Sequence, residues 1–310
     1  MRKLLLLLLL GTASTGLART PAGRLLDAID RITEGKRASV GVAVLLPGSS
    51  EVIASGEDDR YPMMSVFKLH VAAAALSKME REQIPPDEEL ILQTRVLRPN
   101  TYSPLRDACA DSPFFRITHE ELLRYSISLS DNNACDLLIE FAGGPSAVDS
   151  CIRRAGIADF AVTQTEHTMH LDPQNCYANR TSPTAAVRLL EALCDGRIVT
   201  GRYLDVLMRA LLATETGPDK LRAGIPTDIP LGHKTGSSDR TPEGVKIGDN
   251  DAGFFPLPDG SRCYLAVFVR DSQEDDAANA RIIARIAEAV YAEATRPASG
   301  RTQKRKTKRP

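Results

Sequence analysis

The sequence predicts an α/β domain with an all-helical domain inserted into it: an antiparallel sheet flanked by helices and built from both ends of the chain. Segments with strand character lie toward both ends of the sequence, whereas the middle has helical periodicity broken at proline and glycine. At 310 residues the chain is long enough for one large domain or two ordinary ones. These observations together favour one sheet domain interrupted by a helical insertion.

The first 18 residues have the pattern of a secretory signal peptide. Arg2 and Lys3 precede an apolar run at residues 4–10, and small residues follow. The pattern predicts cleavage after Ala18 and therefore a periplasmic or secreted protein. The apolar run is too short to cross a bilayer, and no other run of spanning length follows it, so we expect no stable membrane span.

Residues 19–61 and 214–296 are predicted to form the sheet domain. An amphipathic helix is expected at residues 24–34, and a turn at residues 47–50 separates the first two strand candidates. The other elements expected in this domain are strands and one closing helix, at residues 40–46, 51–55, 231–237, 253–257, 264–269 and 277–293.

Residues 62–213 are predicted to form the helical domain. Helical periodicity, interrupted at proline and glycine, predicts helices at residues 65–82, 119–128, 131–142, 145–155, 183–195 and 201–213. Residues 159–183 are polar and show no clear period. A loop of this length is usually functional or disordered, and we expect a catalytic loop here.

The charge distribution argues against a nucleic-acid partner. The formal net charge is −1, yet the tail at residues 297–310 is strongly basic, so the folded body is acidic. From Gly300 the tail has no apolar residue to bury, and we expect it to be disordered.

Six cysteines would meet an oxidising compartment after export, and the sequence does not choose among their possible pairings. They are Cys109, Cys135, Cys151, Cys176, Cys194 and Cys263. Cys135 and Cys194 lie in apolar helical patterns, which predicts buried thiols or structural bridges rather than nucleophiles.

Ser65-Val66-Phe67-Lys68 is the strongest candidate for a nucleophile. On a helix the two polar residues share one face, so the Lys68 amine can reach the Ser65 hydroxyl. A serine hydroxyl needs such a base, and a helix N-terminus adds partial positive charge where an oxyanion would form. Taken alone, the pattern is also that of an ordinary surface helix.

Two further motifs support a catalytic interpretation of the Ser65 motif. Ser130-Asp131-Asn132 lies between two predicted helices and could be a simple helix cap; Lys234-Thr235-Gly236 lies on a predicted strand and could be a simple strand end. All three motifs, in this order and context, resemble the class A β-lactamases and the penicillin-binding proteins. The resemblance covers about residues 24–296, and it implies a serine acyl-enzyme.

Glu166, in the long loop, separates these two relatives. It lies where class A β-lactamases place the general base that activates water, which a penicillin-binding protein or D,D-peptidase does not need. The resemblance therefore implies hydrolysis of the β-lactam ring and β-lactam resistance, with a cell-wall peptidase as the alternative. A non-enzymatic envelope protein on the same fold is a second alternative. The residues around Ser130, Glu166 and Lys234 resemble the extended-spectrum, cephalosporin-hydrolysing branch most closely.

The resemblance also implies a role for each matched residue. Ser65, Lys68, Ser130, Glu166 and Lys234 would be catalytic; the backbone N–H groups of Ser65 and Ser237 would form the oxyanion hole; Asn132, Thr235, Gly236 and Ser237 would bind substrate. No metal or cofactor is implied, and the histidines lack a His-x-His-x-Asp zinc pattern. We expect a monomer that acts on small-molecule β-lactams.

Three departures from the family pattern concern the loop and a disulfide. His170 stands where many members have an asparagine that steadies the water, and its imidazole could take this role. Gln164 and Asn179 replace a common Arg–Asp ion pair, and an amide–amide hydrogen bond could take its place. The positions of the common disulfide hold Ala72 and Leu123.

Overall fold

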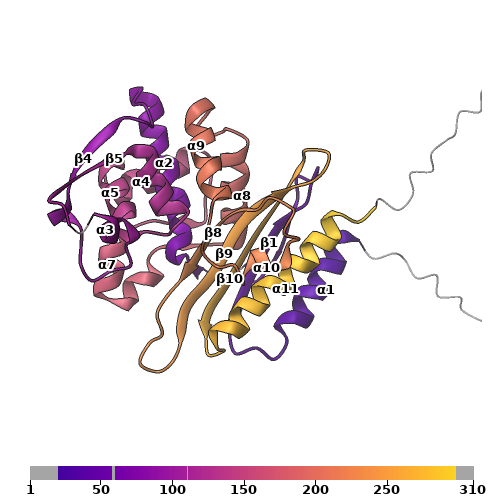
Figure 1. Ribbon diagram of the computed structural model, residues 1–310. Coiled ribbons are helices and arrows are strands. Elements are labelled where there is room, and N and C mark those ends of the chain that lie inside the picture. The colour runs from indigo at the N-terminus through magenta and orange to yellow at the C-terminus, as the bar shows by residue number, and fades with distance from the viewer. Residues whose placement is uncertain (1–19, 58–59, 110, 298–310) are drawn as a thin grey trace, which may run out of the picture.

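A computed structural model describes residues 20–57, 60–109 and 111–297 (Figure 1). The predicted signal peptide with its cleavage site, and the basic tail from residue 298, lie outside the described residues. A five-stranded antiparallel sheet, in the order β2-β1-β10-β9-β8, joins strands from both ends of the chain and confirms the predicted fold class. The strands are β1 (Ser39–Leu45), β2 (Val52–Ser55), β8 (Gly232–Ser237), β9 (Lys246–Pro256) and β10 (Arg262–Ser272).

Two helices from opposite ends of the chain cover one face of this sheet. α1 (Pro21–Thr33) and α11 (Asp276–Ala294) lie side by side in Figure 1, and α10 (Leu221–Gly224) packs beside α11. Leu25 and Ile283 are buried in one apolar cluster with residues of the sheet. Because this cluster takes residues from both ends of the chain, its burial stabilises the fold only when both ends are present.

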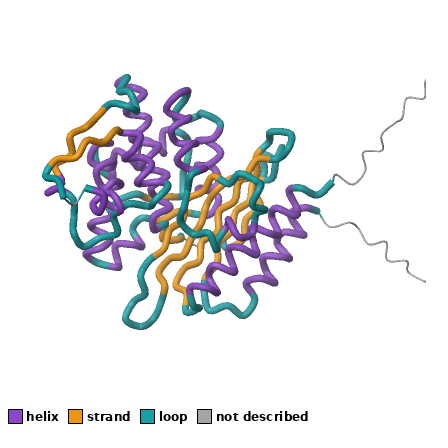
Figure 2. The backbone as a smooth tube through the Cα atoms, in the orientation of Figure 1, coloured by secondary structure: helices purple, strands orange, loops and turns teal. Residues whose placement is uncertain are grey.

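The other face of the sheet carries the helical part of the molecule, as the grouping of helices in Figure 2 shows. α8 (Pro183–Cys194) packs against β1 and β10. The other long helices are α2 (Lys68–Glu82), α4 (His119–Ile127), α5 (Asn132–Ala142), α6 (Pro145–Arg154) and α9 (Gly201–Leu212). α2 contacts the other four of these helices, and its buried alanines let their backbones approach it closely.

Every predicted helix is present, with its ends within a few residues of the prediction. The helical part also contains elements that the sequence did not predict: the strand pair β4 (Glu89–Gln93) and β5 (Phe114–Thr118), and the short helix α3 (Pro104–Ala108). Burial alternates along both strands, but ELILQ and FFRIT carry apolar residues at successive positions, so the sequence lacks the apolar–polar alternation that identifies a strand.

The long loop at residues 159–183 contains more regular structure than expected. It holds the helix α7 (Glu166–Leu171), the 3₁₀ helix η3 (Pro173–Tyr177) and two short strands, β6 (Phe160–Ala161) and β7 (Arg180–Thr181). These strands form a small sheet with β3 (Tyr61–Pro62), just before the Ser65 motif. The loop is thereby joined at its base to the segment that leads to Ser65.

All six cysteines are described, and each is a buried free thiol. Burial raises the pKa of Cys176 to about 11 and that of Cys194 to about 12. These thiols are therefore protonated and unreactive at neutral pH. Of the two possibilities for Cys135 and Cys194, the structure has the buried thiol.

Candidate active site

Ser65 lies in a 3₁₀ turn, η1 (Met64–Phe67), that leads into α2. The predicted helix thus begins as 3₁₀ structure, and the α-helix itself starts at Lys68. Met64, directly before the serine, has a φ of 46°, a left-handed conformation that costs energy for a side chain of this size. Strain of this kind commonly marks a functional site, and here it lies directly before Ser65.

The end of β8 packs directly against this turn at Gly236. A Cβ atom on Gly236 would lie 2.6 Å from the Met63 carbonyl oxygen and 2.9 Å from the Ser65 nitrogen. Only glycine allows this approach, because both neighbours are backbone atoms. The role of Gly236 is therefore to bring the strand end that carries Ser237 beside the Ser65 amide.

Lys68 is completely buried, and polar atoms surround its ammonium group. Nζ donates to Ser65 Oγ at 3.0 Å, to the Ser130 carbonyl oxygen at 2.7 Å and to Asn132 Oδ1 at 2.7 Å. Glu166 Oε1 lies 2.9 Å from the same nitrogen. A buried charge needs such partners, and these contacts fix the amine beside the serine hydroxyl.

Glu166, at the start of α7 in the long loop, lies close to Ser65. Its Oε1 accepts from Ser65 Oγ at 3.3 Å, although the two residues are 101 positions apart in sequence. The structure thus brings together Ser65, Lys68 and Glu166. A carboxylate and an amine both lie within reach of the serine proton, the arrangement that general acid–base catalysis requires.

Asp136 positions Glu166 and was not predicted as a site residue. Its carboxylate accepts from the backbone N–H of Glu166 at 2.8 Å and of His167 at 3.0 Å. Burial, the largest cause, raises the pKa of Asp136 to about 6. The only sequence signal for this contact was that Asp136 is a carboxylate in the helix that follows Ser130-Asp131-Asn132.

Ser130 lies between two lysines. Lys234 Nζ donates to Ser130 Oγ at 2.8 Å and to the Thr235 carbonyl oxygen at 2.8 Å, and Lys68 Nζ lies 3.4 Å from the same Oγ. Burial, followed by the nearby Lys68 cation, lowers the pKa of Lys234 well below its usual value. This setting suits a hydroxyl that relays a proton.

The neighbours of Ser130 have separate tasks. Asp131 is buried and caps α5 by accepting from Ala134 N at 2.8 Å, and it also accepts from Leu105 N at 2.7 Å. The cap interpretation is thus right for Asp131. Asn132 donates to Thr101 Oγ1 at 2.8 Å while its carbonyl oxygen accepts from Lys68, so its amide faces the cleft in a fixed orientation.

Asn179 closes the base of the loop in a different way from the one expected. Its Oδ1 accepts from the backbone N–H of Thr163 at 2.8 Å and of Gln164 at 2.9 Å, and its Nδ2 donates to the Gln164 carbonyl oxygen at 3.0 Å. The bond therefore joins the Asn179 amide to the main chain, not to the Gln164 side chain. A side chain as short as asparagine satisfies two N–H groups at once in this geometry.

Two adjoining cavities open beside these groups. One of about 380 Å³ is lined by Glu166 and His170 on the loop side and by Ser237 and Asp239 on the strand side. The other, of about 230 Å³, is also lined by Glu166, Asn132 and His170. His170 is exposed and borders both cavities beside the Glu166 carboxylate.

In the part of the chain that the structure describes, no group of three or more histidine, cysteine or acidic side chains could hold a metal ion. Across the same residues, no helix is long and apolar enough to span a membrane.

Comparison with known proteins agrees with this site. The model of the β-lactamase enzyme family matches residues 24–294. A β-lactamase of Bacteroides uniformis is 44% identical over 85% of this chain and 88% of its own length. The extended-spectrum β-lactamase PER-1 of Pseudomonas aeruginosa is 36% identical over 86% of this chain and 85% of its own length.

Solved structures give the same result. The crystal structure of a class A β-lactamase from Bacteroides cellulosilyticus superposes with a TM-score of 0.86 at 44% identity, covering 89% of this chain and 99% of that one. The extended-spectrum β-lactamase TLA-1 superposes with a TM-score of 0.85 at 36% identity, covering 88% and 99%. The chain therefore belongs to the β-lactamase enzyme family. It is a class A serine β-lactamase, a hydrolase that opens β-lactams and confers resistance to them.

Proposed function

We propose that Ser65 attacks the lactam carbonyl and becomes acylated. The new Ser65 Oγ–carbon bond forms while the lactam C–N bond breaks, and the serine proton leaves to a base. Two groups are near enough to take it: Glu166 Oε1 at 3.3 Å, directly or through a water, and Lys68 Nζ at 3.0 Å, which can act as the base only in its neutral amine form. The backbone N–H groups of Ser65 and Ser237 would stabilise the tetrahedral oxyanion.

Ser130 would donate its proton to the departing ring nitrogen. Its Oγ accepts from Lys234, 2.8 Å away, which keeps it polarised and helps to replace the proton it gives up. Lys234, Thr235 and Ser237 would hold the substrate carboxylate, and the Asn132 amide would bind the side-chain amide of the substrate.

Glu166 would then take a proton from a water that attacks the acyl carbon, releasing Ser65 with its proton restored. His170, on the same cavity wall, would steady this water. The observation that carries the proposal is the Glu166 carboxylate, 3.3 Å from Ser65 Oγ and 2.9 Å from Lys68 Nζ. A carboxylate at this point favours turnover over a permanently acylated, penicillin-binding protein.

Intact mass measurement tests the deacylation step. Glu166→Gln protein mixed with a cephalosporin should accumulate an adduct on Ser65, whereas wild-type protein should return to its free mass. Ser65→Ala protein is the matched control and should form no adduct. Undiminished turnover by Glu166→Gln would contradict the role of Glu166, and a long-lived adduct on wild-type protein would favour the peptidase alternative.

We further propose that the enzyme is exported and belongs to the extended-spectrum, cephalosporin-hydrolysing branch. Similarity to PER-1 and to TLA-1, both named as extended-spectrum enzymes, supports the second point. The test compares kcat/KM for a penicillin and for cephalosporins with small and bulky side chains. A strong preference for the penicillin would exclude this branch. Recovery of the protein from the cytoplasmic fraction with its leader uncleaved would exclude export.

A further inference from the structure

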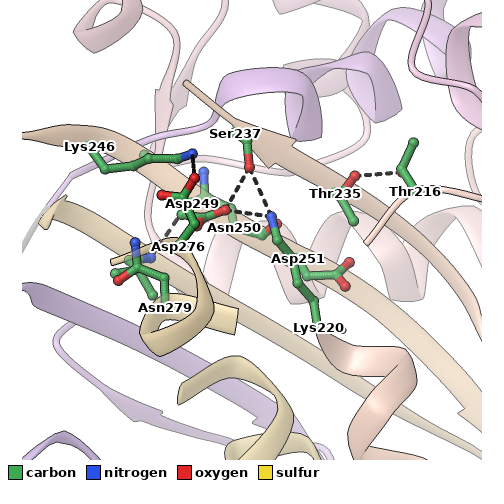
Figure 3. A network of polar contacts seen from close by, with 12 residues as sticks. Thr216, Lys220, Thr235, Ser237, Lys246, Asp249, Asn250, Asp251, Asp276 and Asn279 are labelled. Atoms are coloured by element: carbon green, nitrogen blue, oxygen red, sulfur yellow. Dashed lines mark hydrogen bonds and ion pairs between the residues drawn. The ribbon is translucent and has the colours of Figure 1, made fainter. Parts of the chain in front are cut away.

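A buried ion pair lies beside Ser237, at the end of the cleft where the substrate carboxylate is expected (Figure 3). Lys220, just before α10, and Asp249, on β9, approach to 2.5 Å between Nζ and Oδ1. Lys220 is 7% exposed and Asp249 is 2% exposed. Neither residue belongs to the motifs that identify the family in this sequence.

The hydrogen bonds of this pair include the Ser237 hydroxyl. Ser237 Oγ donates to Asp249 Oδ1 at 2.6 Å and accepts from Lys220 Nζ at 3.0 Å. The lysine also lies 3.4 Å from the Asn250 carbonyl oxygen. An ammonium has three N–H donors and a serine hydroxyl has one proton, so the donors of both groups are already used.

This arrangement has a consequence for an anionic substrate. A carboxylate at Thr235 and Ser237 would gain from the Lys220 cation and from the Ser237 proton, but Asp249 holds both. The Asp249 carboxylate also places a negative charge close to the incoming one, where burial weakens solvent screening. The Lys220 cation and the Asp249 carboxylate that already binds it therefore lie together beside the end of β8.

We infer that Asp249 is a specificity-determining residue that competes with the substrate carboxylate for Lys220 and Ser237, and so weakens ground-state binding of anionic β-lactams. The inference rests on the proposed placement of that carboxylate. Asp249 acts through Lys220 and Ser237 and not on the reacting atoms, so its effect belongs in KM and not in kcat.

Asp249→Asn is the primary test, because it keeps the shape and an oxygen acceptor while removing the charge. With a chromogenic cephalosporin that carries its free carboxylate, KM should fall about tenfold, equivalent to about 1.4 kcal/mol of binding, with kcat within about twofold. The methyl ester of the same compound lacks the charge and should show no change in KM. An unchanged or higher KM for the acid, or an equal response of acid and ester, would overturn the inference.

The double variant Lys220→Met/Asp249→Asn covers the case in which the single variant fails to fold. It removes both charges together and leaves no buried ion unpaired. Because Lys220 is already committed to Asp249, the KM of this variant for the acid should stay within about twofold of wild type. A tenfold rise would show that Lys220 already serves the substrate, and would refute competition by Asp249. Turnover by wild-type protein is measured in the same assay, and its absence would count against the proposed function instead.

Discussion

The side of the cleft that carries Ser65 is built from buried secondary structure, whereas the side that carries Glu166 is tied in place by single side chains. Ser65 lies in η1, Lys68 begins the central helix α2, and Gly236 brings the strand β8 into close contact with this turn. Glu166 instead depends on Asp136 and Asn179, which bond to the main chain of its loop. Because of this difference, we expect that substitutions can slow acylation and deacylation separately.

Removing the Lys68 cation should give the largest loss. In Lys68→Met the serine hydroxyl loses its 3.0 Å neighbour, and Glu166 loses its ion-pair partner. We expect kcat/KM to fall about 10⁴-fold through the loss of acid–base assistance. A stopped-flow assay should show no rapid acylation phase, and a normal acylation phase in this variant would mean that Glu166 alone suffices as the base.

Asp136→Ala should damage the other side of the comparison. It removes both hydrogen bonds to the backbone of Glu166 and His167, so the carboxylate loses its fixed position. We expect deacylation to slow about 100-fold while acylation changes only a few-fold, a split that follows from misplacing a general base. Time-resolved mass spectra should then show an accumulating adduct.

The conservative variant Asp136→Asn keeps one good acceptor and should lose less than Asp136→Ala. Equal loss of acylation and deacylation in Asp136→Ala would mean that the two sides of the cleft are not independent.

Asn179→Ala should chiefly lower stability. It leaves the part-buried main-chain N–H groups of Thr163 and Gln164 without their Asn179 partner, at a cost of about 2–3 kcal/mol, which for a protein of this size lowers Tm by roughly 5–10 °C. Thermal unfolding with and without a bound inhibitor would measure it. Gln164→Ala is the control, since the bonds use the main chain of that residue; an equal drop in this variant would favour an amide–amide contact.

The smallest effect concerns His70, which lies on α2 behind the acylation side. Burial lowers its pKa to about 4, so at pH 5 the unfolded chain binds a proton that the native state does not. The contribution of neutral His70 to the free energy of unfolding is fully present above the ordinary histidine pKa of about 6.5. It is lost as the pH falls, and the loss between pH 7 and pH 5 is about 2 kcal/mol. Urea unfolding of wild type and His70→Asn at both values measures the difference.

The native carboxyl of Asp136 has the opposite dependence, because its raised pKa favours the folded state as the pH falls. The His70 contribution is therefore taken as the difference between variant and wild type. If His70→Asn loses as much stability as wild type between pH 7 and pH 5, His70 is not the cause of the acid destabilisation.

The residues that the sequence predicted correctly to meet in one site are those in short motifs. Ser65 and Lys68 are joined across one turn of helix, and Ser130 and Asn132 stand on either side of the Asp131 cap of α5, so both placements are local. Glu166 was predicted by its position in a resemblance, and the structure places it at the serine. The helices were predictable for a similar reason, because their periodicity is a local property.

Asp136, Lys220 and Asp249 could not be predicted in the same way. Each acts on a partner that lies far away in sequence: Asp136 on Glu166, and Lys220 on Asp249 across two elements. The start of β9 was missed for a related reason. Its first residues are polar, and they are buried only because partners such as the Pro62 carbonyl oxygen, 2.8 Å from Asn250 Nδ2, satisfy them.

The pairing of β1 with β10 has a consequence for the order of folding. Val42 lies opposite Val267, so the first long strand waits for a segment made near the end of synthesis. Contacts of such large sequence separation form slowly, because much chain must be closed into a loop first. The central sheet therefore cannot be completed on a growing chain before β10 has been synthesised.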